Sequence, residues 1–209
     1  MGDYQSLIHT LALTMGVAWA SGINLYAAVA VLGLAGNAGY VHLPDTLTIV
    51  EDPLVIAAAC FMYCVEFFAD KVPGVDSTWD AVHTFIRIPA GAMLAAGAVG
   101  DVSPAISVAA GLLGGSIAAA THATKAGTRL LINTSPEPFS NWFASIGEDL
   151  TVFAGLWAAL AHPYIFLFLL TLFLLTLCWV LPKLWRGLKT VFRKIGGFFG
   201  RRPENPSPV

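Results

Sequence analysis

Charged residues occur in three groups within a chain that is otherwise strongly apolar. The first group is a repeated Glu-Asp pair, at Glu51-Asp52 and Glu148-Asp149, and each pair precedes an apolar stretch. Such carboxylates can simply cap helices, because the N-terminal end of the helix dipole is positive. If the two pairs converge inside a bundle, they could instead bind a cation or relay protons, since neighbouring desolvated carboxylates rarely both stay ionised.

The second group is an acid-rich segment between two apolar stretches. Its acids are Glu66, Asp70, Asp76 and Asp80, and its cations are Lys71, His83 and Arg87. Glu66 and Asp70 are one helical turn apart, as are His83 and Arg87, so each pair would share a helix face. The segment could be a solvated interfacial loop with a tryptophan at the headgroup level. The density of acids beside cations favours a paired network instead.

The third group is a cationic stripe. His122, Lys125 and Arg129 fall at positions i, i+3 and i+7, and so lie on one face of a helix. Arg129 is close enough to the predicted helix end to extend to the interface, whereas His122 and Lys125 lie deeper. Inside a bundle, this stripe would either neutralise the carboxylates or receive an anionic group.

The composition indicates that lipid surrounds much of the chain. Of the 209 residues, 56% are hydrophobic and 11% are charged, whereas a soluble domain carries about 25% charged residues. A charge inside a bilayer costs about 2.5–3.5 kcal/mol, so it persists only if it is paired, hydrated or functional. The net charge of −2 argues against a nucleic-acid partner, which would require a basic face.

Six hydrophobic segments predict an all-α, polytopic membrane helix bundle with broken or re-entrant helices. They cover about residues 7–34, 52–69, 77–100, 103–132, 140–161 (or 149–161) and 163–181. The first is interrupted by Ser21-Gly22-Ile23-Asn24, weak helix formers with a polar amide, so we expect a break there. Residues 77–100 fit either one kinked span or a re-entrant pair.

An internal repeat relates the two halves of the chain. Residues 48–57 align with residues 145–154, and Ile, Glu, Asp, Val and Ala coincide. Three spans per half would make the repeats inverted, as in many transporters. We therefore predict a membrane domain over residues 1–182, with repeat 1 at about 7–100 and repeat 2 at about 104–181.

The C-terminal segment carries most of the basic residues. Seven of the 11 Lys and Arg residues follow position 182: Lys183, Arg186, Lys189, Arg193, Lys194, Arg201 and Arg202. By the positive-inside rule, the C-terminus of this multi-pass protein faces the cytoplasm from the inner (cytoplasmic) membrane. Residues 183–202 are typical of a basic amphipathic helix lying along an anionic leaflet, and residues 203–209 predict a disordered tail.

The acid-rich segment also resembles a known family. Residues 66–80, EFFADKVPGVDSTWD, and residues 83–87, HTFIR, are similar to the signature of bacterial membrane proteins grouped as domain of unknown function 4126. The likeness extends from about Leu7 to Ala161, and the family implies a membrane protein without implying an activity. A weaker resemblance, in VPGV at 72–75 and FIRIPAG at 85–91, is to the DedA-type lipid translocases, which use re-entrant helices and inverted repeats. Order and spacing differ, so this likeness points only toward lipid-phosphate substrates.

These observations predict a membrane transporter or lipid translocase for a charged, anionic (lipid-phosphate-like) substrate, which passes through a polar cavity between two repeats. The expected substrate-binding residues are Asn24, His83, Arg87, His122, Lys125 and Arg129. The residues expected to couple transport to protons or cations are Glu51, Asp52, Glu66, Asp70, Asp76, Asp80, Glu148 and Asp149.

Two other functions stay open. In a divalent-cation transporter, the repeated Glu-Asp pairs would supply hard oxygen ligands. A non-transporting membrane scaffold would dock a partner through its basic tail, with its charges fully paired and no water-accessible cavity. The sequence has no nucleophile elbow, P-loop, HExxH or dinucleotide fingerprint, so we expect no enzyme activity, cofactor or resident metal. The acids and histidines leave an intramembrane hydrolase open, without a positive signal for one. The expected partners are membrane lipids and a small charged substrate or ion, and a homo-oligomer is compatible with the sequence.

Overall fold

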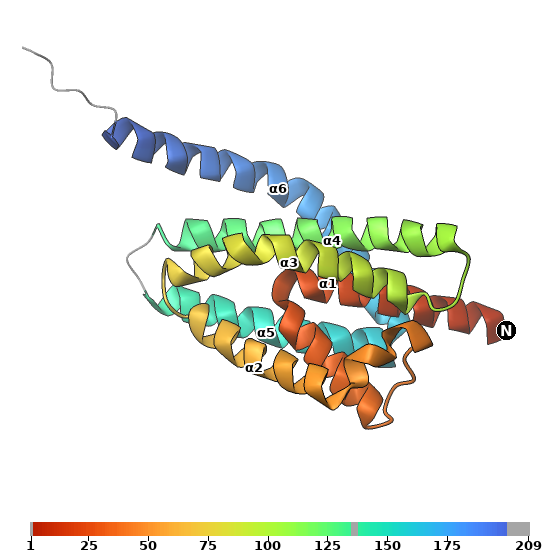
Figure 1. Ribbon diagram of the computed structural model, residues 1–209. Helices are drawn as coiled ribbons and strands as arrows, with labels where there is room; N and C mark the ends of the chain where they lie inside the picture. The colour runs from red at the N-terminus through yellow and green to blue at the C-terminus, as the bar shows by residue number, and fades with distance from the viewer. Residues whose placement is uncertain (1, 135–137, 200–209) are drawn as a thin grey trace, which may run out of the picture.

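The computed structural model describes residues 2–134 and 138–199, and every regular element within these ranges is a helix. The order is α1 (Gly2–Asn37), the short 3-10 helix η1 (Asp45–Glu51), α2 (Pro53–Ala69), α3 (Val75–Ala98), α4 (Pro104–Ile132), α5 (Pro138–Ala161) and α6 (Pro163–Phe199) (Figure 1). Five helices are long and apolar enough to span a membrane, and η1 with α2 forms a bent pair, at 63°, that would make six. The predicted all-α, multi-pass bundle is therefore confirmed.

The ends of α2 and the start of α3 follow from local sequence. The Asp52 side chain accepts a hydrogen bond at 2.8 Å from the amide of Leu54, and Pro53 occupies the first helical position. The chain then turns sharply into α3 at Gly74, whose φ of 85° is in the left-handed region that favours glycine. The turn between α2 and α3 is consequently short and brings the acid-rich segment onto two adjoining helices.

Helix α1 consists of two arms joined at Asn24. This residue has an extended backbone (φ −146°, ψ 97°), which confirms the predicted break. His9 and Thr10 of the first arm line the same cavity as Tyr40 and Val41, which follow the second arm. Both ends of α1 therefore lie at one end of the bundle, as Figure 1 shows, and α1 is a re-entrant helical hairpin with its tip inside the protein.

The first arm of α1 is the centre of the bundle. The most apolar window of α1 is 78% buried, whereas that of α6 is 17% buried, so α6 is a peripheral helix. The arm packs closely on α4 at Gly22, where an added Cβ would overlap the hydroxyl of Thr121 and lie 2.6 Å from the carbonyl oxygen of Ala118. Only glycine permits this approach, which fixes the tip of the hairpin against the middle of α4.

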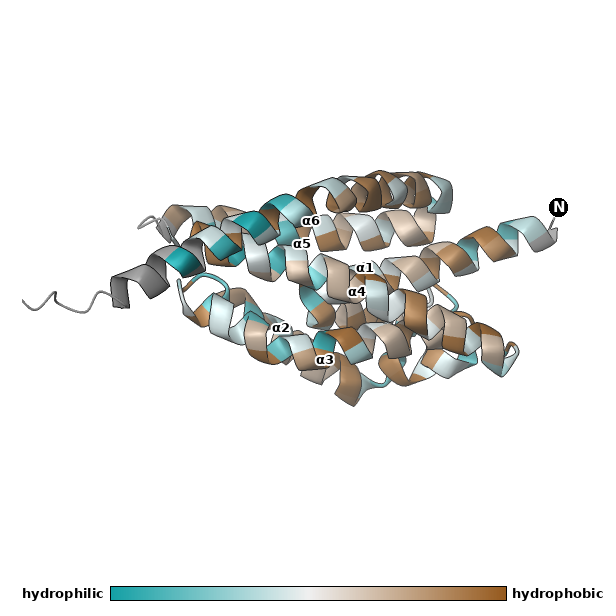
Figure 2. Ribbon diagram, turned by 90° about the horizontal axis from the view of Figure 1, so that it is seen from above, coloured by the Kyte–Doolittle hydropathy of each residue, from teal (hydrophilic) through white to brown (hydrophobic). Residues whose placement is uncertain are grey.

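The remaining helices run between the two ends of the bundle. Residues 77–98 belong to the single helix α3, which contains Pro89 in its interior. Helix α6 continues through Pro182, so the predicted interfacial segment begins as an extension of the sixth span. Its exposed basic residues are Lys183, Arg186, Lys189 and Arg193. Figure 2 shows hydrophilic residues along this part of α6. Arg201, Arg202 and the tail 203–209 lie outside the described residues.

Candidate functional site

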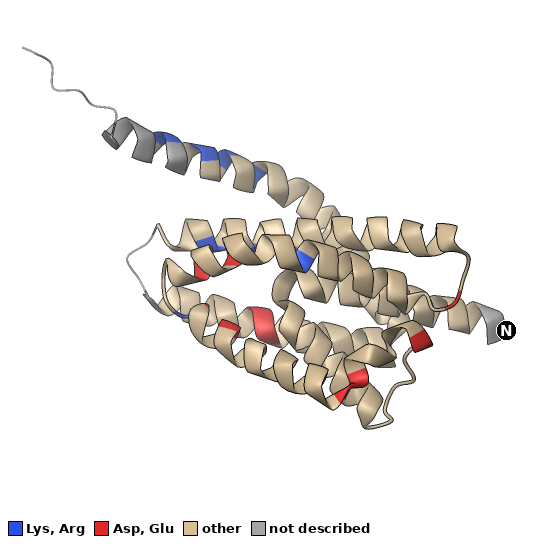
Figure 3. Cartoon of the chain, viewed as in Figure 1, with Lys and Arg blue, Asp and Glu red and all other residues tan. Residues whose placement is uncertain are grey.

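The charged residues of α2, α3, α4 and α5 meet in one half of the bundle, at the end where α2 turns into α3 and α4 ends (Figure 3). Here four carboxylates and three cations of the described chain form one ion-pair network: Glu66, Asp70, Asp80 and Glu148 with Arg87, Lys125 and Arg129. The predicted acid-rich segment and cationic stripe thus pair with each other.

Arg87 couples α2, α3 and α4, and its side chain is 0% exposed. Its Nη2 lies 2.5 Å from Glu66 Oε1, and its Nη1 lies 3.1 Å from Asp80 Oδ1. Nη1 also donates to His122 Nδ1 at 3.2 Å. Because a guanidinium has five donors and stays charged, it serves several acceptors at once in the interior.

Lys125 joins the network to the broken helix. Its Nζ donates to Glu66 Oε1 at 3.1 Å, to Asp70 Oδ2 at 3.0 Å and to the carbonyl oxygen of Ile23 at 3.1 Å. Ile23 ends the first arm of α1, where carbonyls lack helical partners and the helix dipole is negative. The ammonium therefore compensates both the acids and the helix end, and all three of its N–H groups are used.

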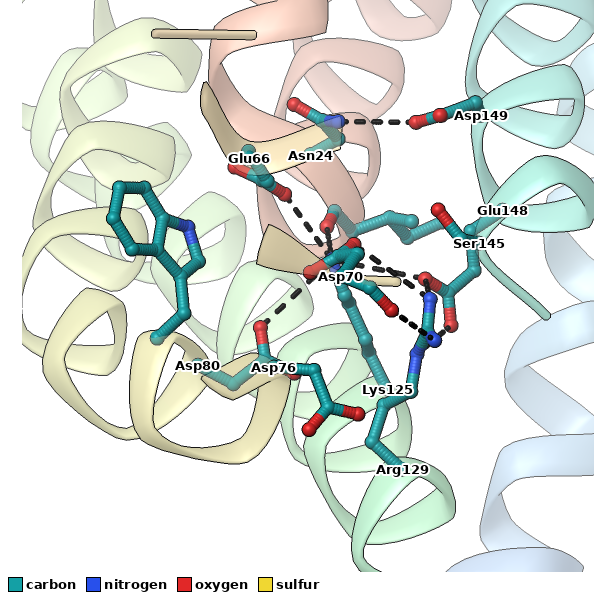
Figure 4. A network of polar contacts seen from close by, with 12 residues as sticks. Asn24, Glu66, Asp70, Asp76, Asp80, Lys125, Arg129, Ser145, Glu148 and Asp149 are labelled. Carbon is teal, nitrogen blue, oxygen red and sulfur yellow. Dashed lines mark hydrogen bonds and ion pairs between the residues drawn. The ribbon is translucent and has the colours of Figure 1, made fainter. Parts of the chain in front are cut away.

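Arg129 holds α5 against α4. It forms a two-pronged ion pair with Glu148, with Nε 3.2 Å from Oε1 and Nη2 2.7 Å from Oε2. Its Nη1 donates to the carbonyl oxygens of Asp70 and Asn141 at 3.2 and 3.0 Å. This parallel arrangement is the strong form of the arginine–carboxylate pair. Figure 4 shows Lys125 and Arg129 side by side, directed at Asp70 and Glu148.

Asn24 links the hairpin tip to α5. Its side-chain Nδ2 donates to Asp149 Oδ1 at 3.1 Å, while its Oδ1 accepts from the amide of Ala27 at 2.9 Å. The second contact caps the second arm of α1, because the first amides of a helix lack internal partners. One amide side chain thus stabilises the break and connects it to a buried carboxylate.

We expect Asn24→Ala to lower the free energy of unfolding. The lost cap is worth about 0.5–2 kcal/mol, and the lost bond to a carboxylate is worth about 1.5–3 kcal/mol. Thermal unfolding of the purified protein in detergent measures the change. Asn37→Ala is the matched control. Asn37 is exposed at the C-terminal end of α1, where its side chain donates to the Glu51 carbonyl. Equal melting temperatures for the two variants would contradict the role of Asn24.

The two predicted histidines contact neighbouring helices through their ring nitrogens. His122 Nδ1 accepts from Arg87, so its proton is on Nε2, which faces Thr84 Oγ1 at 2.7 Å. His83 Nδ1 donates to the carbonyl of Trp79 at 2.8 Å, and its Nε2 lies 3.0 Å from the hydroxyl of Tyr26. Both imidazoles join helices to one another.

Asp76 lies in the first turn of α3 and binds backbone amides there. It accepts from the amides of Gly74 and Ser77 at 2.9 and 2.6 Å, and from Asn133 Nδ2 at 2.8 Å. Asn133 in turn accepts from Asn141 at 2.7 Å. These contacts connect the C-terminal end of α4 and the first turns of α5 to the start of α3. Sequence reasoning missed Asn133 and Asn141, because uncharged amides near a loop carry no distinguishing pattern.

Glu51 and Asp52 lie outside the network. Glu51 is half-buried beside Gly36, and Asp52 is exposed at the start of α2. The whole of α2, 17 residues, separates Asp52 from Asp70. The structure therefore does not bring the two Glu-Asp pairs together, and Glu148-Asp149 lies within α5 instead of preceding it.

Lys71 lies beside the network in the turn between α2 and α3. Its Nζ donates to the carbonyl of Phe67 at 2.9 Å and to Ser145 Oγ at 3.4 Å. Burial lowers the pKa of the Lys71 ammonium, while the carboxylates of Asp149 and Asp70 act in the opposite direction.

The network is short of positive charge and of hydrogen bonds. Four carboxylates face three cations in the described ion pairs. One oxygen of each of Glu66, Asp70 and Asp80 is buried without a hydrogen-bond partner in the described chain. Buried carboxylate oxygens usually have partners, so these three oxygens are able to accept a further hydrogen bond or a proton.

A pocket of about 380 Å³ reaches the network between α4 and α5, and Lys125 and Glu148 form part of its wall. The Glu148 side chain is 20% exposed, whereas those of Glu66, Asp70 and Asp80 are at most 4% exposed. Glu148 is therefore the carboxylate of the network that is accessible from the pocket.

Comparisons with known proteins identify a family only. The family model described as "Domain of unknown function (DUF4126)" matches residues 11–183. None of the curated proteins and none of the solved structures matches the chain. The weaker likeness to DedA-type lipid translocases has no support among these comparisons.

Proposed function

We propose that this chain, which belongs to the DUF4126 family, is a membrane transporter or lipid translocase that moves a charged substrate without catalysing its chemical conversion. The observation that carries the proposal is the unbalanced ion-pair network at the tip of a re-entrant helix, in contact with a pocket through Glu148. Helices that end inside the membrane commonly form the substrate and ion sites of transporters.

The proposal includes an orientation of the protein in the inner membrane. The exposed basic residues of α6 lie alongside the half of the bundle that holds the network (Figure 3), since Leu184 and Gly187 pack beside Gly127 and Leu131 near the end of α4. The positive-inside rule puts this end in the cytoplasm, and the basic segment would contact the anionic leaflet there. The network then occupies the cytoplasmic half of the bilayer.

The coupling species that fits the network is a proton or a monovalent cation. Arg87, Lys125 and Arg129 are each engaged by carboxylates, so they act as counter-charges in the observed state. The surplus carboxylate is the group that a proton or cation would neutralise. The proposal therefore departs from the anionic substrate expected from the sequence. The charge of the substrate is instead inferred from the residues that line the pocket.

The alternatives fit the geometry less well. A divalent-cation site built from both Glu-Asp pairs would require two groups that α2 holds apart. A scaffold with fully paired charges conflicts with the unpartnered oxygens of Glu66, Asp70 and Asp80 and with the pocket at Glu148.

The inverted repeat remains part of the proposal, with α1 to α3 in the first half and α4 to α6 in the second, although α1 does not cross the bundle and leaves two crossing helices in the first half. The halves differ in detail, because α1 is broken at Asn24 while α4 is continuous over Pro104–Ile132. A transporter needs only one such break to create a helix end beside its substrate.

Reconstitution tests the proposal directly. The full chain in liposomes is expected to accelerate translocation of acyl-labelled phospholipids, and a change of pH across the membrane is expected to alter the rate. Glu66→Gln should reduce the rate to that of protein-free vesicles, because it removes a charge shared by Arg87 and Lys125. Glu51→Gln is the matched control, because Glu51 lies outside the network. Rates equal to those of protein-free vesicles, for wild type and for phospholipids of every headgroup charge, would contradict the proposal.

A further inference from the structure

The pocket at Glu148 adjoins a second, apolar cavity. That cavity has a volume of about 430 Å³ and is lined by α5 and α6, together with Trp19 of α1. Thr151 and Phe173 line both cavities. We call these two adjoining cavities the α5–α6 groove; its polar end has hydroxyls and a carboxylate, and its other end has apolar side chains.

The polar end of the groove offers acceptors. The Lys125 ammonium uses its three N–H groups on Glu66, Asp70 and Ile23. The hydroxyl of Thr151 donates to the carbonyl of Gly147 at 2.6 Å, and that of Thr124 donates to the carbonyl of Ala120 at 2.9 Å. Their remaining capacity is to accept hydrogen bonds, and the partly exposed Glu148 carboxylate only accepts.

The charge of the polar end, like its hydrogen-bond acceptors, favours a ligand that donates hydrogen bonds. The network carries four carboxylates against three cations in the described chain, and Glu148 is its member on the groove. A phosphate or carboxylate group placed there would meet the Glu148 carboxylate and the accepting threonine hydroxyls, while the nearest cations, Lys125 and Arg129, are already engaged by carboxylates. A primary ammonium would supply three donors and one positive charge.

We infer that the α5–α6 groove binds a membrane lipid whose headgroup ends in a primary ammonium. The ammonium lies at Glu148 and the neighbouring threonine hydroxyls, and an acyl chain follows the apolar cavity beside Trp19 and Phe166. The inference rests on the proposed function, because it names the substrate class of the same site.

Lipid binding to the full-length protein tests the inference without any transport step. The delipidated protein is mixed with equal amounts of phosphatidylethanolamine, phosphatidylcholine and phosphatidylglycerol of one acyl composition, and retained lipid is measured by native mass spectrometry. Phosphatidylethanolamine should be retained about tenfold or more over the others, the scale of a charge-assisted hydrogen bond. Phosphatidylcholine keeps the positive charge without N–H donors, and phosphatidylglycerol keeps the phosphate without the cation.

Gly147→Leu locates the site. Gly147 lines the polar end of the groove, and a Cβ added there meets nothing within 4 Å, so a leucine fills the pocket without disturbing α5. This variant should lose the preference for phosphatidylethanolamine. Ala123→Leu is the matched control, because Ala123 is exposed on α4 and does not line the groove. Thr151→Val, which removes one acceptor, should reduce the preference by a smaller factor.

Three results would overturn the inference: equal retention of the three lipids, preference for phosphatidylglycerol, or an unchanged preference in Gly147→Leu. The failure of the proposed function is distinguishable. Selective retention without translocation in liposomes would overturn the transport proposal and keep the site. Translocation without selective retention would overturn the site and keep transport.

Discussion

Replacing Arg87 with methionine is expected to lower the free energy of unfolding by about 3–5 kcal/mol, the usual cost of removing one partner from a buried ion pair. The variant would leave Glu66 and Asp80 charged in the interior without their closest cation. It would also remove the donor to His122 Nδ1, so that three helices lose a common partner.

Chemical unfolding of the detergent-purified protein measures this loss. Arg186→Met is the control, since Arg186 is exposed on α6 and its substitution should stay within about 0.5 kcal/mol of wild type. The double variant Glu66→Met with Arg87→Met removes both charges and should recover part of the loss, because apolar replacement of a whole buried pair is often neutral. An Arg87→Met protein as stable as Arg186→Met would show that the network contributes nothing to folding.

Replacing Lys125 with methionine is expected to cost a similar amount, again about 3–5 kcal/mol, and to loosen the tip of α1 in particular. Lys125 is the cation that contacts the carbonyl of Ile23, so its loss leaves this helix end beside the uncompensated charges of Glu66 and Asp70. The described ion pairs would then contain four carboxylates and two cations.

Amide hydrogen exchange separates the two effects. In Lys125→Met, exchange should rise most at residues 23–27, where the two arms of α1 join, whereas Arg87→Met should act mainly on α2 and α3. Lys183→Met is the control, because Lys183 is exposed on α6. Uniform exchange changes in Lys125→Met would contradict a specific link between Lys125 and the helix break.

The bundle and much of the network could be predicted because they follow from local rules. Apolar stretches of spanning length define helices, and the amide of Asn24 within an apolar run indicated the break. Helical spacing placed Lys125 and Arg129 on one face and Glu66 and Asp70 on another. Which acid meets which cation depends on how the helices rotate about their axes, and spacing within a helix does not determine that.

The acidic pairs show where local similarity misleads. Glu51-Asp52 and Glu148-Asp149 have the same letters in a similar context, yet Asp52 starts α2 whereas Asp149 lies within α5. The start of α5 is at Pro138, upstream of the similar block, so the block itself does not position the helix. Asp149 then reaches Asn24 instead of capping a helix.

The bend in α1 also determines whether the number of helices that cross the bundle is odd or even. Because α1 turns back on itself, only the five helices α2 to α6 carry the chain from one face of the bundle to the other. In the proposed orientation, five passes put the N-terminal end of α1 and the basic part of α6 on opposite sides of the membrane. Counting the 36 residues of α1 as a full pass would give an even number and place both in one compartment. In that proposal, the break at Asn24 in the middle of an apolar segment sets the number of passes, and with it the side of the membrane on which each loop lies.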